Sequence, residues 1–140
     1  MLKHPSNLAL GRNVLSISSA REDHDSLRRI LNDPSWRVNV AFSCQQAMTY
    51  LCRDRIGIIV CDCFLRDGSW RDILSHIADL TEPPVVIVTT GAAGADFRAE
   101  VHALGGFEVL SKPFREEEVT RIAIAAWQNR SVTIPEPAPA

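Results

Sequence analysis

The feature that most limits the fold of this chain is a strict alternation between short apolar runs and helical patterns, repeated five times. The apolar runs lie at residues 13–18, 36–42, 57–62, 85–89 and 108–111. Each has the length and the β-branched content of a strand, and each is followed by apolar residues at helical spacing. Such an alternation is typical of a parallel sheet covered by helices on both faces. The sequence therefore predicts an α/β protein.

Five repeats with right-handed crossovers fit a flavodoxin-like (βα)5 fold, a doubly wound parallel sheet with strand order 2-1-3-4-5. Expected helices start at Glu22, at Ser43 with Gln46 as a capping box, and at Ser69 with Asp72 as an acidic version of that cap. Two more are expected near 97–104 and over 116–129. In the second strand, even-numbered residues 36–42 are expected to point inward and odd-numbered ones outward. The expected inward helix residues are Ala47, Tyr50, Leu51, Ile73, Leu74, Ile77, Leu80, Phe97, Val101, Leu104, Val119, Ile122, Ala123 and Ala126.

The length of 140 residues favours a single domain, which we place at residues 13–130. Residues 1–12 are expected to be a flexible lead-in without the apolar segment of a secretory signal. Residues 131–140 carry three prolines in the last six positions, so we expect an extended tail or a linker stub. The longest apolar runs have about six residues, too short to span a bilayer. These features favour a cytoplasmic protein with no membrane partner.

The charge is nearly balanced, with 15 basic and 17 acidic residues and a net charge of -2. No basic stripe marks a nucleic-acid surface, and no helix-turn-helix pattern follows residue 129. We therefore expect no nucleic-acid partner. The four cysteines, Cys44, Cys52, Cys61 and Cys63, lack further ligands at metal-site spacing, so buried free thiols are favoured over a metal site.

Three of the expected strands end on polar side chains, namely Asp62, Thr89 and, just past the last strand, Lys112. The carboxyl ends of parallel strands form one edge, where sites of this fold lie, so these groups are expected to converge and could hold a phosphoryl group. Glu22 and Asp23 follow the first strand at the same edge. Each residue also has an ordinary interpretation: Asp62 as a turn former, Thr89 as a strand residue, Lys112 as an exposed cation, and the acidic pair as stabilisers of a helix start.

The segments that carry these residues resemble the receiver domain of bacterial two-component response regulators. The matching segments are Ile59–Asp62, Val86–Thr89 and Ser111-Lys112-Pro113-Phe114, and the resemblance covers about Asn13–Asn129. It implies a signalling module rather than an enzyme. Its partners would be a histidine kinase or phosphotransfer protein upstream and another protein downstream.

The resemblance also implies a role for each site residue. Asp62 would be the phosphoacceptor, since a carboxylate is a competent nucleophile towards a phosphoryl donor. Lys112 would form an ion pair with the phosphoryl oxygens and Thr89 would donate a hydrogen bond to them. The peptide bond after Lys112, to Pro113, is expected to be cis.

A magnesium ion is the cofactor that the resemblance implies. Its expected ligands are the carboxylates of Glu22, Asp23 and Asp62 and the backbone carbonyl of Phe64. Carboxylate and carbonyl oxygens are the hard ligands that this ion requires.

The chain departs from the family pattern in three places. Ser18 and Ser19 come directly after Val14–Ile17, where the family has its acidic pair, so either Glu22 and Asp23 fold back into the crevice or the metal site is depleted. The loop after Asp62 is shorter, and Arg66 is hypothesised to occupy the place of the phosphoryl group as a built-in cation. Val109 replaces the usual aromatic residue three positions before the lysine, which leaves the signalling surface undefined.

Two other functions compete with a phosphorylated receiver. A pseudo-receiver would use the same fold as a protein-binding module without phosphorylation. A small enzyme or flavin carrier would use Ser16, Ser18 and Ser19 as a phosphate-binding loop, although the acids that follow argue against it. Trp127, late in the last helix, is a candidate for a homodimer face.

Overall fold

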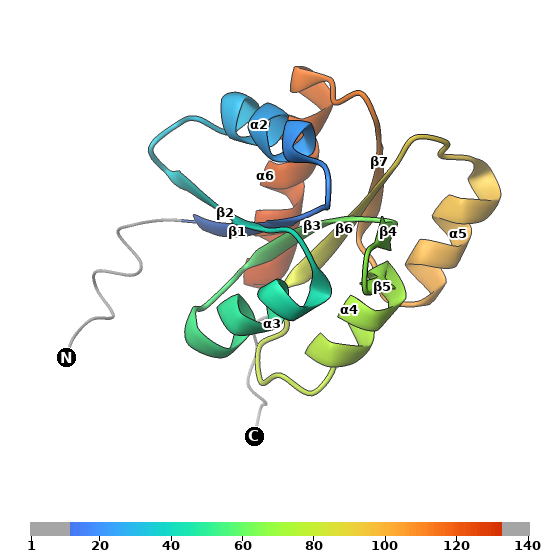
Figure 1. Cartoon of the computed structure of the whole chain (residues 1–140). Helices are drawn as coiled ribbons and strands as arrows, with labels where there is room; N and C mark the ends of the chain where they lie inside the picture. Colours follow the sequence, from blue (N-terminus) through green and yellow to red (C-terminus); the bar gives the residue numbers. More distant parts are fainter. Residues whose placement is uncertain (1–11, 133–140) are drawn as a thin grey trace.

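The computed structural model describes residues 12–132 and contains one five-stranded parallel sheet (Figure 1). The strands lie in the order β2-β1-β3-β6-β7, which is the predicted order 2-1-3-4-5 of the five sheet strands. The strand bounds are β1 Arg12–Ile17, β2 Trp36–Ala41, β3 Ile58–Asp62, β6 Val85–Thr90 and β7 Glu108–Ser111. The helix bounds are α2 Arg21–Ile30, α3 Cys44–Arg53, α4 Trp70–Ile77, α5 Ala95–Ala103 and α6 Glu116–Val132. The flavodoxin-like fold is thus confirmed.

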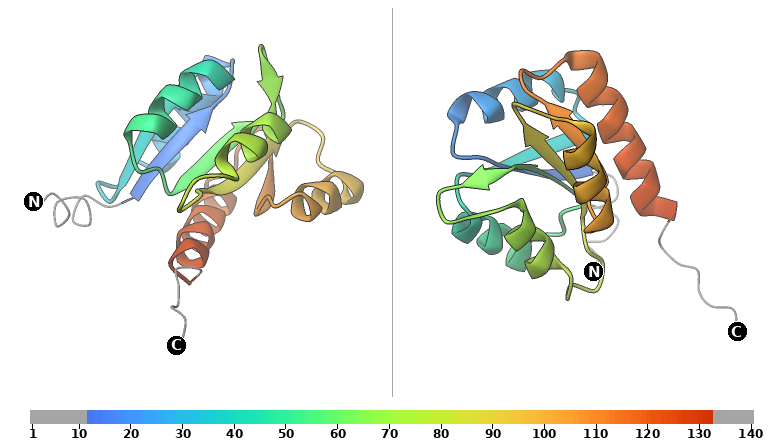
Figure 2. Two further views of the ribbon diagram at one scale, coloured as in Figure 1. Left: turned by 90° about the horizontal axis from the view of Figure 1, so that it is seen from below. Right: turned by 90° about the vertical axis from the view of Figure 1, so that its right-hand side faces the viewer.

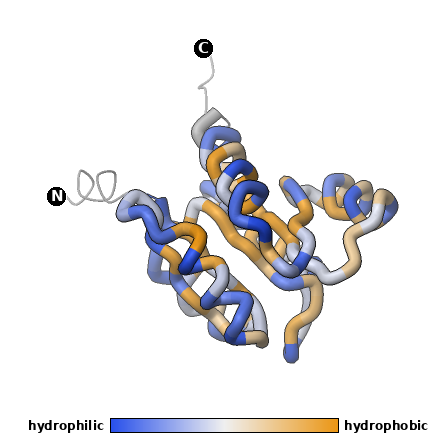
Figure 3. The backbone as a smooth tube through the Cα atoms, turned by 90° about the horizontal axis from the view of Figure 1, so that it is seen from above, coloured by the Kyte–Doolittle hydropathy of each residue, from blue (hydrophilic) through white to orange (hydrophobic). Residues whose placement is uncertain are grey.

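The helices cover the sheet in two layers, with α3, α4 and α5 on one face and α2 and α6 on the other (Figure 2). Each inner strand supplies both layers, because successive side chains point to opposite faces. In β3, Ile59 packs towards α3 and α4, whereas Ile58 and Val60 pack towards α2 and α6. Because these strands are buried on both faces, their sequences are continuous apolar runs. The central strands are accordingly coloured as hydrophobic in Figure 3.

The two predicted helix caps, at Ser43 and Ser69, are confirmed in their main hydrogen bonds. Ser69 Oγ accepts a hydrogen bond from the backbone of Arg71, and the Asp72 carboxylate accepts one from the backbone N–H of Ser69. At α3, Ser43 Oγ accepts from the backbone of Gln46, but the Gln46 side chain accepts from Phe42 N–H instead of closing the box on Ser43. Both arrangements satisfy backbone N–H groups that lack partners within the helix.

Several predicted orientations and boundaries are wrong. Leu80 and Leu104 are 38% and 51% exposed, because α4 ends at Ile77 and α5 at Ala103, so neither residue is held against the sheet by a helix. Ala41 was expected to face outward but is fully buried, because helices cover both faces of β2 near its end. The remaining expected inward residues are buried or half-buried.

The expected domain limits also shift slightly. Helix α6 continues to Val132, so the first two residues of the expected tail are helical, and residues 133–140 lie outside the described part of the chain. Of the expected lead-in, Arg12 already belongs to β1, and residues 1–11 lie outside the described part. None of the helices described between residues 12 and 132 is long and apolar enough to cross a membrane.

A small hairpin follows β3, within the shortened loop after Asp62. It consists of β4 (Phe64–Leu65) and β5 (Gly68–Ser69), paired antiparallel around Arg66 and Asp67. The Asp67 carboxylate accepts hydrogen bonds from the first two backbone N–H groups of α3, at 2.8 and 3.1 Å. The hairpin is therefore tied to the start of a helix about 22 residues earlier in the sequence.

Candidate functional site

Parallel pairing places Asp62 and Thr89 side by side at the carboxyl edge of the sheet. The two residues are register partners of β3 and β6. Lys112 follows β7, and its backbone N–H donates to Thr90 at the end of β6. The three residues that the sequence predicts to converge are thus brought together by strand pairing alone.

One oxygen of Asp62 accepts every hydrogen bond that this carboxylate receives from the described residues. Its Oδ1 accepts from the backbone N–H of Cys63 at 3.0 Å, from Thr89 Oγ1 at 3.3 Å and from Lys112 Nζ at 3.1 Å. No bond to Oδ2 is found within residues 12–132. A carboxylate held by one oxygen keeps the other available for an incoming group.

Lys112 bridges the carboxylates of Asp23 and Asp62, which lie 89 and 50 positions before it in the sequence. Its Nζ lies 3.0 Å from Asp23 Oδ2 and 3.1 Å from Asp62 Oδ1. The side chains of Lys112, Asp23 and Asp62 are only 26%, 12% and 16% exposed, so the three charges are screened less than surface charges. Burial alone would lower the pKa of Lys112, but the hydrogen bonds to Asp23 and Asp62 outweigh it and raise that pKa above 10.5. The peptide bond from Lys112 to Pro113 is cis, as expected.

Asp23 reaches the site from the first turn of α2. Its Oδ2 accepts a second hydrogen bond from Ser18 Oγ, at 2.7 Å, beside the one from Lys112. Its Oδ1 has no hydrogen bond to a residue of the described range. Glu22, one position earlier on the helix, is exposed and does not join the cluster. Of the expected acidic pair, the fold therefore brings Asp23 into the crevice and leaves Glu22 at its rim.

The oxygen donors at this edge fit a small hard cation. Asp23 and Asp62 each keep one oxygen without a described partner, and two carboxylates beside one ammonium leave a negative charge uncompensated. Within residues 12–132 there is no group of three or more His, Cys, Asp or Glu arranged as a metal site. Magnesium does not need such a group, because it keeps several waters and often takes only one or two protein carboxylates.

The remaining predicted residues lie around the hairpin. Phe64, whose carbonyl is an expected metal ligand, lies two residues beyond Asp62 and is 75% exposed. Arg66 is exposed in the hairpin turn, and among the described residues no ion pair joins it to Asp62. The hypothesis that Arg66 is a built-in cation at the phosphoryl position therefore finds no contact in its favour. Lys112 is the cation beside Asp62.

Three residues behind the site were not predicted as a unit. His24 is almost fully buried, with Nε2 2.9 Å from the Ser18 carbonyl oxygen and Nδ1 2.8 Å from Ser16 Oγ. Burial is the main cause that lowers the pKa of His24, which favours the neutral ring. A sequence signal existed, because His24 shares the helical spacing of Leu27 and Leu31 and so faces the sheet. Ser16 and Ser18 already bond to His24 and Asp23, which argues against their use as a phosphate-binding loop.

The side chains of Val109, the cysteines and Trp127, which the sequence singles out, lie outside the cluster at the carboxyl edge. Val109 is fully buried in the layer that contains α5. Cys44 and Cys61 are buried thiols, whereas Cys52 is exposed, contrary to the expectation of four buried thiols. Trp127 is partly buried against the layer of α2 and α6, with the guanidinium group of Arg12 5.9 Å from its ring.

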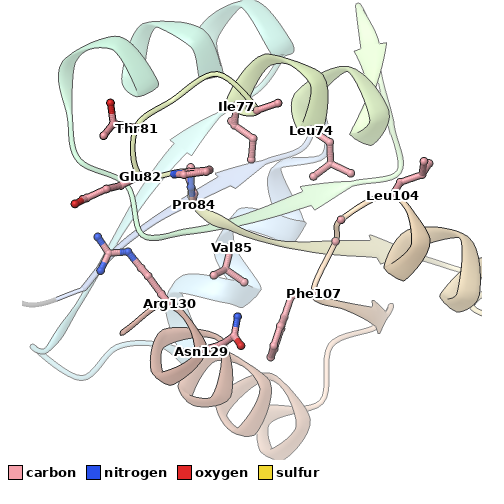
Figure 4. Close-up of a pocket in the computed structure, with 14 residues that line it drawn as sticks. Leu74, Ile77, Thr81, Glu82, Pro84, Val85, Leu104, Phe107, Asn129 and Arg130 are labelled. Atoms are coloured by element: carbon pink, nitrogen blue, oxygen red, sulfur yellow. The ribbon is translucent and has the colours of Figure 1, made fainter. Parts of the chain in front are cut away.

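An apolar groove lies at the opposite, amino-terminal end of β6, far from Asp62 in the topology. Leu74, Ile77 and Val85 form its floor and walls, with Phe107 on the side of β7 and Asn129 on α6 (Figure 4). Its volume is about 810 Å³. It contains neither the converging carboxylates nor Lys112, so the chemistry of the cluster belongs to the carboxyl edge of the sheet.

Comparison with known proteins gives a consistent family. A family model described as the response regulator receiver domain matches residues 14–124. The KDP operon transcriptional regulatory protein KdpE of Escherichia coli (strain K12) is 25% identical over 126 residues, which are 89% of this chain and 56% of KdpE. The chain therefore spans little more than half the length of this relative.

Solved structures show the same fold. The signal receiver domain of an HD domain-containing protein from Pseudomonas fluorescens Pf-5 superposes with a TM-score of 0.79 at 18% identity, covering 89% of this chain and 92% of that one. A CheY-like response regulator receiver domain protein from Methanospirillum hungatei JF-1 gives a TM-score of 0.77 at 15% identity, covering 88% and 98%.

Proposed function

The chain belongs to the response regulator receiver domain family, and from this premise we propose that Asp62 accepts a phosphoryl group and that the domain signals through altered protein contacts. The observation that carries the proposal is the bridge from Lys112 to Asp23 and Asp62, with the Thr89 hydroxyl on the same Asp62 oxygen. A nucleophile, a fixed cation and a hydroxyl donor then stand together in one partly buried crevice. The donor would be a histidine kinase or a phosphotransfer protein.

The chemistry follows from the two oxygens of Asp62. Oδ1 is held by three donors, so Oδ2 is the oxygen we assign as nucleophile. It forms a bond to phosphorus while the bond from phosphorus to the donor's imidazole nitrogen breaks, and the imidazole leaves with the electron pair. The product is an acyl phosphate on Asp62. Lys112 then pairs with the new phosphoryl oxygens, and Thr89 donates its hydroxyl hydrogen to one of them.

We propose that Asp23 and Asp62 hold a magnesium ion, with water and the Phe64 carbonyl as further ligands. When bound, the ion supplies compensation for the negative charge that phosphoryl transfer concentrates in the crevice. Glu22 belongs to this set only if its side chain turns inward from the rim. Lys112 already compensates the charge of one of the two carboxylates, so one negative charge is left for the magnesium ion to compensate.

The test is intact mass after incubation with Mg²⁺ and a small acyl phosphate as phosphodonor. We expect one added phosphoryl group on the wild-type chain and none on Asp62→Asn, which keeps the shape of the side chain but is not a nucleophile. Asp54→Asn, at an exposed carboxylate after α3, is the control and should take up phosphate like the wild type. Addition that survives in Asp62→Asn would contradict the assignment of the phosphoacceptor.

The second candidate is a pseudo-receiver that binds a partner without phosphorylation. Ser18 and Ser19 at the end of β1, in place of acids, favour it. A Mg²⁺ titration followed by NMR separates the two functions: shifts of Asp23 and Asp62 at millimolar Mg²⁺ support the phosphorylated receiver. A folded protein with no such shifts and no uptake of phosphate from a phosphorylated histidine donor would support the pseudo-receiver.

A further inference from the structure

We propose that Ser18 and His24 are positioning residues that hold the Asp23 carboxylate in the crevice and so replace an acid at the end of β1. The inference deepens the proposed function and rests on it where Mg²⁺ is concerned. Neither residue touches the phosphoryl position. Each acts through another group: Ser18 through the Asp23 carboxylate, and His24 through the backbone of Ser18.

The Ser18 hydroxyl is fixed by two hydrogen bonds. It accepts from the backbone N–H of Ala20 at 3.0 Å and donates its single hydrogen to Asp23 Oδ2 at 2.7 Å. Ser18 is buried, so water does not compete for either bond. The hydroxyl and the Lys112 ammonium both bind Oδ2 of Asp23, which leaves Oδ1 as the oxygen that faces other ligands. Ser18 and Lys112 together therefore leave Oδ1 as the available oxygen of Asp23.

His24 fixes the backbone that carries this hydroxyl. A carbonyl oxygen can only accept, so the 2.9 Å contact requires that His24 Nε2 carries the hydrogen and donates it to Ser18. In the neutral ring, Nδ1 then accepts from the hydroxyl of Ser16, at 2.8 Å. The ring edge also packs against Phe42, with centroids 4.6 Å apart and planes at 77°. Two hydrogen bonds and one aromatic contact leave the imidazole a single orientation.

The position of α2 explains why this support is needed. Three residues separate the end of β1 from the start of α2, and Asp23 lies on the helix rather than on the strand. Ala20, at the N-cap position of α2, provides no side-chain cap for it. A carboxylate at such a helix start can adopt several rotamers unless another group holds it. Among the described residues just after β1, Ser18 is the one that binds the Asp23 carboxylate. The path from His24 through Ser18, Asp23 and Lys112 ends at Asp62.

The test compares Ser18→Ala with Ser19→Ala. Both variants remove one hydroxyl, from adjacent residues of the same connection, but Ser19 is exposed and makes none of the described hydrogen bonds. We expect Mg²⁺ affinity, measured by NMR titration, to fall about tenfold or more in Ser18→Ala, since loss of groups that orient metal ligands typically costs 10–100-fold. Ser19→Ala should stay within about twofold of the wild type, by the same reasoning.

A second readout does not depend on Mg²⁺ or phosphate. The side-chain carboxyl ¹³C shift of Asp23 and the ε-methylene shift of Lys112, in metal-free protein, should move in Ser18→Ala and stay in Ser19→Ala. If these shifts move but the wild type binds no Mg²⁺ and takes up no phosphate, the positioning role stands and the proposed function fails. If both shifts and Mg²⁺ affinity are the same in the two variants, the positioning role is overturned.

Paired variants at position 24 test the second half of the path. The amide nitrogen of Gln is as many bonds from the backbone as His24 Nε2, so His24→Gln should retain the hydrogen bond to the Ser18 carbonyl. His24→Phe fills the same space but cannot donate this hydrogen bond. We expect His24→Phe to reproduce the Asp23 shift change of Ser18→Ala and His24→Gln to restore most of the wild-type value. Thermal melting shows whether both variants are folded. If His24→Phe and His24→Gln are both folded and have equal Asp23 shifts, the role of His24 is overturned.

Discussion

Removal of the Lys112 ammonium is the perturbation whose effect follows most directly from the structure. In Lys112→Met the side chain keeps its apolar stem but loses both bonds, to Asp23 Oδ2 at 3.0 Å and to Asp62 Oδ1 at 3.1 Å. A hydrogen bond to a charged group contributes about 1.5–3 kcal/mol, so two give about 3–6 kcal/mol before the loss of lysine hydration is subtracted. Because the Lys112 side chain is 26% exposed, we expect a net loss of about 1–2 kcal/mol in the free energy of unfolding.

The pH dependence of this loss has a definite sign. The pKa of Lys112 is raised in the folded protein, so its stabilisation is fully present below the unfolded value and disappears as the pH rises through the folded value. The difference in unfolding free energy between wild type and Lys112→Met should therefore be constant between neutral pH and about pH 10, and shrink above it.

Urea denaturation followed by tryptophan fluorescence measures this difference, because Trp70 is buried in the core. Arg115→Met is the control: it removes a cation three residues away that is exposed and makes none of the described ion pairs. If Lys112→Met loses no more stability than Arg115→Met, or if the loss does not diminish at alkaline pH, the desolvation of Lys112 cancels its two ion pairs and our reasoning is refuted.

Three further predictions concern the fold. Gly57→Ala should lose about 1–3 kcal/mol of stability, because the new Cβ would lie 2.4 Å from the Trp127 ring, whereas Gly91→Ala, with nothing within 4 Å, should melt close to the wild type. Asp67→Ala should melt at a lower temperature than the wild type near pH 7, because hydrogen bonds from the backbone of α3 stabilise the charged carboxylate and lower the pKa of Asp67. The difference in melting temperature should vanish as the pH falls through that lowered pKa. Equal melting of the two proteins near pH 7 would contradict this prediction. Val109→Phe should destabilise by about 1–3 kcal/mol in the same melting assay, because the fully buried site is filled; an unchanged melting temperature would show that the core can repack.

The cluster at the carboxyl edge could be predicted because it depends on strand register. Once the chain alternates between strands and helices, the ends of β3, β6 and β7 must meet at one edge, and so must Asp62, Thr89 and Lys112. That prediction needs only the hydrophobic period, which is local in the sequence, and the general rule that crossovers between parallel strands are right-handed.

The choice between Glu22 and Asp23 could not be made from the sequence. The two acids are adjacent on α2. Which of them faces the crevice therefore depends on how far α2 is rotated about its axis and on the length of its connection to β1. The packing of Leu27 and the buried His24 against the sheet sets that rotation. The same packing puts Ser18 within 2.7 Å of Asp23, a contact between side chains five positions apart that no period of a strand or helix predicts.

The sequence by itself determined the order of the strands, the two apolar layers and the identity of the three residues at the carboxyl edge, because each follows from patterns of two to four residues and from general rules of chain handedness. Only the tertiary structure decided that Lys112 pairs with Asp62 while no described ion pair joins Arg66 to it, that Leu104 is exposed and Ala41 buried, and that Asp23 is held by Ser18. These outcomes depend on where helices end and how they rotate against the sheet, and packing between distant segments sets both.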